Sequence, residues 1–215
     1  GAIYVHEYAA TGRVQPETLL SKELGYVGRF KGLHLTLDAR LYHERMRDVI
    51  GTTLYPHPET NPLNGRRSRD YVNRTNLSMT GLEYQLRWKP LESTEVWLNQ
   101  SFNRLEWDDP KLELDDERRP PEHTTLIALF QRLPGNLQLG VIHERVGGMT
   151  WRARTDWMPF THRTDLRLAY PFRIGSSRAE AALTVQSAEG AGTFFRVQEN
   201  FKLARKSFLT LRVEM

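Results

Sequence analysis

The nine-residue segment LHLTLDARL, residues 33–41, alternates strictly between apolar and polar side chains. Successive side chains of an extended strand point to opposite faces, so the leucines and Ala39 share one face. His34, Asp38 and Arg40 share the other face with Thr36. A charged face opposite a wholly apolar face indicates a β-strand that separates two different environments.

The same period-two pattern recurs along the chain and predicts nine strands. They cover residues 18–28, 32–49, 71–89, 94–105, 122–133, 136–147, 163–173, 177–187 and 206–215. Ala2–Tyr8 alternates more weakly and is a candidate for a tenth strand. Thr124–Gln131 is apolar on both faces, so the pattern leaves open which of its faces meets apolar surroundings.

The connections between these strands alternate in length. Tight turns rich in Gly, Pro and Ser are expected at Gly28–Gly32, Lys89–Thr94, Leu133–Asn136 and Arg173–Ser177. Long connections separate them at Ile50–Asp70, Leu105–Glu122, Gly147–His162 and Ala188–Lys206. This order is typical of an all-β, antiparallel up-and-down transmembrane β-barrel, with short periplasmic turns and long extracellular loops. A soluble β-sandwich, the alternative, explains neither this order nor the length of the longest strands.

Composition excludes several other classes of protein. The chain of 215 residues contains no run of about 18 apolar residues, which excludes a transmembrane helix. Its 30 basic residues are scattered among 26 acidic ones, which argues against a nucleic-acid partner. The seven histidines lack metal-ligand spacing and there is no cysteine, so we expect neither a metal site nor a cofactor. No nucleophile motif or usable His–acid pair is present, and we expect no enzymatic activity.

Two of the long connections contain candidate ligand-binding residues. In the first, guanidinium groups suit an anionic metal chelate. In the third, aromatic and basic residues suit stacking and cation–π contacts with an aromatic ligand. Solvated loops that meet lipopolysaccharide phosphates, or that pack over the barrel mouth, remain as alternatives. The candidates are Tyr55, His57, Arg66 and Arg67, followed by Trp151, Arg152, Arg154, Trp157 and Phe160.

Several short motifs, in order along the chain, resemble the late barrel strands of TonB-dependent outer-membrane receptors. The resemblance begins at Pro16-Glu17 with Ser21–Tyr26, and continues through Leu37–Tyr42 with Asp48–Ile50 and then Asn73–Glu83. It goes on through Pro121–His123 and Arg163–Leu166. It ends at Phe208–Met215, which resembles the terminal strand that the barrel-assembly machinery reads.

The resemblance implies that residues 1–215 are the C-terminal part of a transmembrane barrel domain in the bacterial outer membrane. Members of this family have about 22 strands around a plug. The chain would then supply about nine or ten of those strands, without the plug domain and the earlier strands. Closure as a small barrel of its own is the alternative. Outer-membrane lipid, lipopolysaccharide, the plug and the remaining strands are the expected partners, with the TonB complex acting indirectly.

The function that the resemblance implies is TonB-dependent uptake of a scarce nutrient, such as a ferric siderophore or another small-molecule metal chelate. A passive outer-membrane pore or export channel is the alternative. The charged strand face would then line the lumen and face the plug. The residues expected there are Asp38, Arg40, Glu83, Arg87, Asp165, Arg167 and Arg212.

Overall fold

A computed structural model describes residues 8–9, 14–54, 69–109, 119–150, 157–190, 192–196 and 199–214. Nearly all of them lie in strands. The strands are β1 (Tyr8–Ala9), β2 (Thr18–Phe30), β3 (Leu35–Leu54), β4 (Arg69–Leu91), β5 (Thr94–Trp107), β6 (His123–Arg132), β7 (Gln138–Val146), β8 (Met149–Thr150), β9 (Trp157–Met158), β10 (Thr161–Ile174), β11 (Ser177–Gln186), β12 (Gly192–Arg196), β13 (Glu199–Leu203) and β14 (Lys206–Glu214). Two 3₁₀ turns, η1 (Lys31–Leu33) and η2 (Pro134–Asn136), join strands. Among the described residues, no helix is long and apolar enough to cross a membrane.

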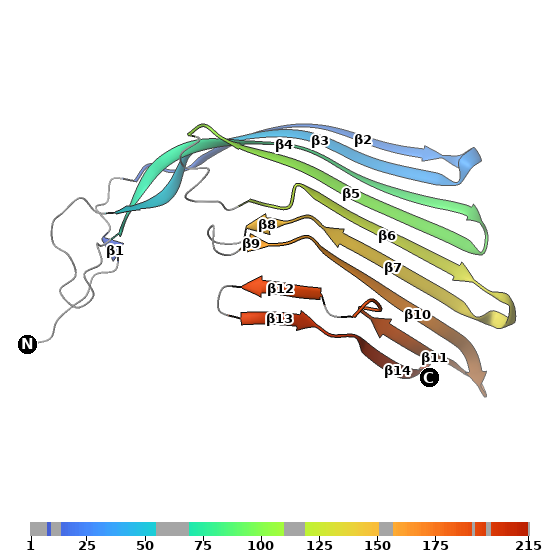
Figure 1. Cartoon of the computed structure of the whole chain (residues 1–215). Coiled ribbons are helices and arrows are strands. Elements are labelled where there is room, and N and C mark those ends of the chain that lie inside the picture. Colours follow the sequence, from blue (N-terminus) through green and yellow to red (C-terminus); the bar gives the residue numbers. More distant parts are fainter. Residues whose placement is uncertain are drawn as a thin grey trace, which may run out of the picture.

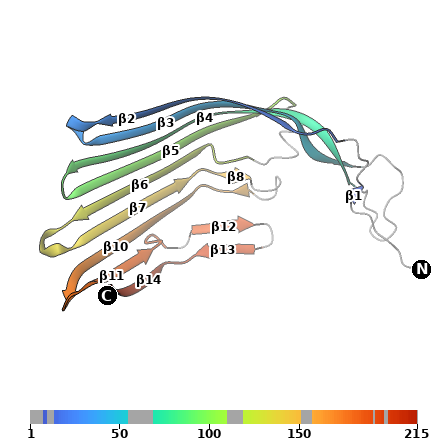
Figure 2. The same ribbon diagram turned by 180° about the vertical axis from the view of Figure 1, so that it is seen from behind.

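Nine long strands form one curved sheet in chain order, β2-β3-β4-β5-β6-β7-β10-β11-β14, and every neighbouring pair is antiparallel (Figure 1). The tight turns lie at one end of the sheet and the long connections at the other, as the reverse view also shows (Figure 2). The nine predicted strands and their up-and-down order are therefore confirmed.

The structure corrects several details of the predicted elements. The first turn lies at Lys31–His34, later than Gly28–Gly32, because β2 continues to Phe30 and His34 takes the left-handed conformation (φ 50°) that reverses the chain. The third and fourth long connections contain the short hairpins β8–β9 and β12–β13. The candidate tenth strand appears only as Tyr8–Ala9, which pairs in parallel with β4; residues 2–7 lie outside the described residues.

Strand register assigns each side chain to one of two faces, because residues directly opposite each other share a face. The polar face contains the opposed pair Arg40 and Glu83, and the apolar face contains Leu37 opposite Leu86. The single layer leaves the apolar face uncovered: Leu24 is 71% exposed and Leu209 is 83% exposed. An exposed apolar surface of this extent requires an apolar partner.

Register also resolves the ambiguity of β6. Ile127 and Leu129 lie opposite Leu98 and Val96 of β5, on the apolar face. Leu126, Ala128 and Phe130 therefore lie on the polar face, beside charged side chains. The polar face thus contains an apolar region that alternation alone does not reveal.

A tyrosine, a glycine and an asparagine form a closely packed contact on the polar face. Tyr42 of β3, Gly81 of β4 and Asn103 of β5 are directly opposed in register. The Tyr42 ring lies across Gly81, its hydroxyl donates a hydrogen bond to Asn103 Oδ1, and the residue is only 4% exposed. Arg40 covers the outer side of the ring at 4.9 Å from the centroid. Glycine is required here because any side chain would occupy the space of the ring.

A carboxylate caps the sheet where β11 ends. Glu189 accepts a hydrogen bond from the Thr164 hydroxyl and another from the Thr164 backbone N–H, at 2.9 Å. The hydroxyl hydrogen bond is the main cause that lowers the pKa of Glu189 to about 2. If β11 continued, a backbone carbonyl would accept the hydrogen bond of the Thr164 N–H. Because β11 has ended, the Glu189 carboxylate accepts it instead.

Replacing Gly81 by Val should destabilise the barrel by about 1–3 kcal/mol, because the new side chain displaces the Tyr42 ring. Tyr42→Phe should cost about 1 kcal/mol through loss of the hydrogen bond to Asn103. The urea midpoint of unfolding in lipid vesicles measures both effects. Gly32→Ala is the matched control, since a Cβ at Gly32 meets no atom within 4 Å. Equal midpoints for Gly81→Val and Gly32→Ala would contradict the packing described.

Titration of Glu189 should be visible at the Thr164 amide. A folded-state pKa below the ordinary value means that this carboxylate stabilises the fold above about pH 4.5 and that the contribution is lost as pH falls toward 2. The amide proton shift of Thr164, followed by NMR, should have its midpoint near pH 2 and should stop titrating in Glu189→Gln. A midpoint near 4.5 would show that the hydrogen bond is not maintained.

Candidate functional site

The seven residues expected in the lumen all lie on the polar face by register. Asp38 and Arg40 lie on β3, Glu83 and Arg87 on β4, Asp165 and Arg167 on β10, and Arg212 on β14. Their contact with a plug domain stays a prediction.

Most of these charges are already paired within the sheet. Arg40 contacts Glu83 at 3.0 Å and Glu23 at 3.4 Å, so one guanidinium joins three strands. Arg167 pairs with Glu180 at 2.5 Å. Such half-exposed pairs contribute little stability each, but they hold the side chains in fixed positions.

Aromatic and in-strand contacts hold three of the other four charges. The guanidinium of Arg87 lies 4.5 Å from the centre of the Trp97 ring. Asp165 pairs with Arg163 along the same strand, and Arg212 pairs with Glu214 at 2.7 Å. The polar face therefore presents an ordered, nearly neutral pattern of charge.

Most of the ligand-binding residues predicted from the sequence cannot be placed. Tyr55, His57, Arg66, Arg67, Trp151, Arg152 and Arg154 lie outside the described residues. Trp157 and Phe160 are described, and both are more than half exposed. Phe160 stacks with His162 at 6.2 Å between ring centres, and His162 lies on the apolar face. Phe160 therefore packs against a residue of the apolar face.

A cavity of about 490 Å³ lies at the end of the sheet that carries the long connections; we call it the loop-end cavity. Four of its lining residues are directly opposed across four strands of the polar face: Leu19, Met46, Leu77 and Trp107. The next row along the strands adds Met79 and Leu105. Together they form an apolar stripe on the polar face.

A backbone bulge and a buried hydrogen-bond donor also shape the loop-end cavity. A bulge at Asp48 (φ 58°) shifts the register of β3, and Val49 and Ile50 both line the cavity although they are adjacent in sequence. Trp107 Nε1 is buried and has no hydrogen-bond partner among the described residues. A buried donor without a partner is costly, and a ligand acceptor would satisfy it. Glu44 and Arg74 also line the cavity and add charge.

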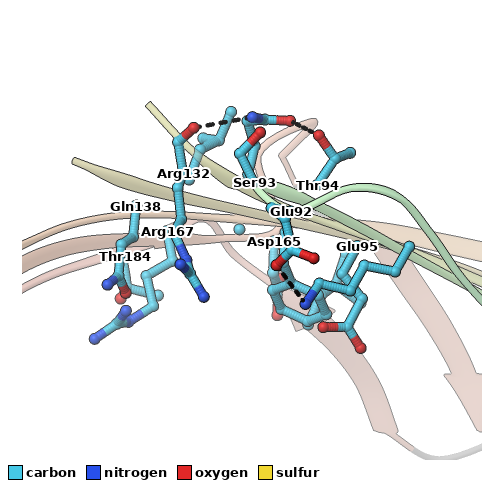
Figure 3. A pocket seen from close by; sticks show the side chains of 15 residues that line it. Glu92, Ser93, Thr94, Glu95, Arg132, Gln138, Asp165, Arg167 and Thr184 are labelled. Carbon is cyan, nitrogen blue, oxygen red and sulfur yellow. Dashed lines mark hydrogen bonds and ion pairs between the residues drawn. The ribbon is translucent and has the colours of Figure 1, made fainter. Parts of the chain in front are cut away.

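A second cavity, of about 480 Å³, lies on the polar face near the tight turns; we call it the turn-end cavity. Phe130 of β6 forms its apolar part together with Gly140 and Ile142 of β7. Figure 3 shows charged and polar side chains around it, including Glu95 and Arg167. Both cavities can bind a molecule with an apolar body and polar substituents.

Sequence reasoning missed both cavities. The available signal was the departure from alternation: Met46 occupies a position whose neighbours of the same phase, Glu44 and Asp48, are charged. Within the described ranges, no three His, Asp or Glu side chains are arranged to hold a metal ion.

Comparison with known proteins identifies the fold. No family model matches the sequence, and no curated protein matches it. Solved structures do match. The ferric-catecholate import receptor Fiu from E. coli K12 superposes with a TM-score of 0.68 at 14% identity, over 98% of this chain and 30% of that one. The ferric enterobactin receptor PfeA from Pseudomonas aeruginosa superposes with a TM-score of 0.66 at 15% identity, over 91% of this chain and 30% of that one. The FrpB iron transporter from Neisseria meningitidis superposes with a TM-score of 0.65 at 12% identity, over 95% of this chain and 32% of that one.

This chain therefore spans about a third of the length of each of these structures. Its nine-stranded antiparallel sheet corresponds to part of a larger transmembrane barrel, as the sequence resemblance predicts. The chain has the fold of part of the transmembrane β-barrel of a TonB-dependent outer-membrane receptor.

Proposed function

We propose that this chain forms part of the wall of an outer-membrane receptor that captures a small metal chelate, of the ferric siderophore class, for TonB-dependent uptake. The observation that carries the proposal is the apolar stripe of Leu19, Met46, Leu77 and Trp107 in the loop-end cavity. Fiu and PfeA, which share the fold, are receptors for a ferric catecholate and ferric enterobactin, and their ligands support this class.

The two faces of the sheet suit opposite surroundings. The apolar face, with Leu24 and Leu209 largely exposed, suits the lipid of the outer membrane. The polar face, with its fixed ion pairs, suits a water-filled lumen or a plug domain. A ligand that enters from the side of the long connections would then meet the loop-end cavity first.

The chemistry of the loop-end cavity matches an aromatic chelate. Met46 and Met79 offer polarisable thioethers, which pack favourably against aromatic rings. Trp107 offers a ring face, and its Nε1–H can donate to a ligand oxygen. Arg74 can contribute a charge toward an anionic chelate.

The open edges of the sheet support the proposal that further strands complete the barrel. Within the part of the chain that the structure describes, β2 and β14 each pair with one neighbour, which leaves a row of backbone groups without a partner strand. Lipid does not tolerate such an edge. Further strands of the barrel are the partners that these edges require.

Ligand capture should be measurable through Trp107. In the full-length polypeptide reconstituted in lipid, titration with a ferric tris-catecholate should quench tryptophan fluorescence saturably. Trp107→Phe should remove most of the quenching, whereas Trp88→Phe on the apolar face should not. Met46→Asp should weaken binding at least about tenfold, because it places a charge in the apolar stripe. Met46→Leu is the matched control.

Two outcomes would contradict the proposed function. Absence of saturable quenching in the folded protein would remove the loop-end cavity as a chelate site. Ion conductance through the reconstituted barrel, without any chelate binding, would favour the passive pore instead.

A further inference from the structure

Along its strands, the apolar face changes from aliphatic to basic side chains. On β3 the residues nearest the tight turn are Leu35, Leu37, Ala39 and Leu41, which cover about 20 Å of strand at about 3.3 Å per residue. The next residues on the same face are basic. Among the described strand residues, nine basic ones on this face are Lys22, His43, Arg45, Arg47, Arg104, His123, His143, Arg145 and His162, and we call them the basic belt.

The belt has an excess of positive charge. It contains one lysine, four arginines and four histidines, against Glu106, Asp108 and Glu189 on the same side. Glu106 pairs with Arg104 at 2.8 Å and Asp108 with Arg45 at 3.5 Å. Glu189 already accepts the two hydrogen bonds of Thr164. The three acids are therefore already paired or hydrogen-bonded. The belt keeps hydrogen-bond donors that can bind a further anion.

Aromatic rings accompany the belt at its centre. Phe160 lies 5.5 Å from the guanidinium of Arg145, and the rings of His143 and His162 are 6.4 Å apart. Phe102 stacks on His123 at 4.6 Å. Aromatic and basic side chains beside an apolar band are the arrangement expected at the boundary between hydrocarbon and head groups.

We propose that the basic belt binds the phosphate groups of lipid head groups in the leaflet that borders the long connections. Guanidinium and imidazole groups are strong donors to phosphate, and the leucines directly below them suit the acyl chains of the same molecule. A free anion would gain nothing from those leucines, which is why a lipid is the expected occupant. This inference rests on the membrane placement in the proposed function, but not on chelate capture.

The first test needs no variant. The full-length protein, inserted into detergent micelles, is titrated with diphosphoryl lipid A and with the same lipid after enzymatic dephosphorylation, and native mass spectrometry counts the lipids retained. The phosphorylated form should bind at least about tenfold more tightly. Equal retention would overturn the proposal. Full competition by inorganic phosphate would also overturn it, because the belt would then be a site for soluble anions.

The second test locates the site. Arg104→Gln with Arg145→Gln should reduce the preference for the phosphorylated lipid about tenfold. Arg29→Gln with Arg173→Gln, two arginines of the polar face near the tight turns, is the matched control and should leave the preference unchanged. An equal loss in the control pair would mean that binding follows overall charge, and would overturn the assignment to the belt.

A protease-protection assay in vesicles separates this proposal from the proposed function. Protein that inserts and binds a ferric tris-catecholate, yet shows no preference for phosphorylated lipid, would overturn the belt alone. Protein that prefers the phosphorylated lipid but binds no chelate would overturn ligand capture alone. Failure to insert would overturn the membrane placement and therefore both.

Discussion

The structure depends on the backbone hydrogen bonds between neighbouring strands. Lipid offers no alternative partner for an N–H or C=O group, so a sheet that crosses a membrane must pair each strand on both sides. This requirement sets the antiparallel order, the tight turns and the register, and register in turn decides which side chains meet. The contact of Tyr42 with Gly81 and Asn103, the ion pairs of Arg40 and the loop-end cavity all follow from the same pairing.

A fold specified in this way places weak demands on the identity of each residue. Any apolar side chain suits the lipid face, and most polar side chains suit the other. The comparison structures share only 12–15% of their residues with this chain and still superpose over more than nine-tenths of it. The positions with strict requirements are few, and they are the ones where side chains cross the backbone of a neighbour, as Tyr42 crosses Gly81.

The period of two in segments such as residues 33–41 was sufficient to predict the nine strands, their up-and-down order and the shared face of the seven lumen residues. It could not predict the functional surfaces. Alternation assigns Leu19, Met46, Leu77 and Trp107 to strands, but only register shows that they are adjacent. The histidines of the basic belt looked dispersed for the same reason. The loop residues predicted to bind ligand remain predictions, since no strand periodicity constrains them.

The bulge at Asp48 has a consequence for how the lining of the loop-end cavity can vary. Because Val49 and Ile50 both line the loop-end cavity, the shape of that cavity depends on the number of residues in β3 as well as on their identity. Insertions or deletions of one residue at the bulge would exchange the side chains that line the cavity, while the hydrogen-bonded strand nearer the tight turn stays in place. Chain length near the rim is thus a second variable, besides substitution, that can change the lining of the cavity.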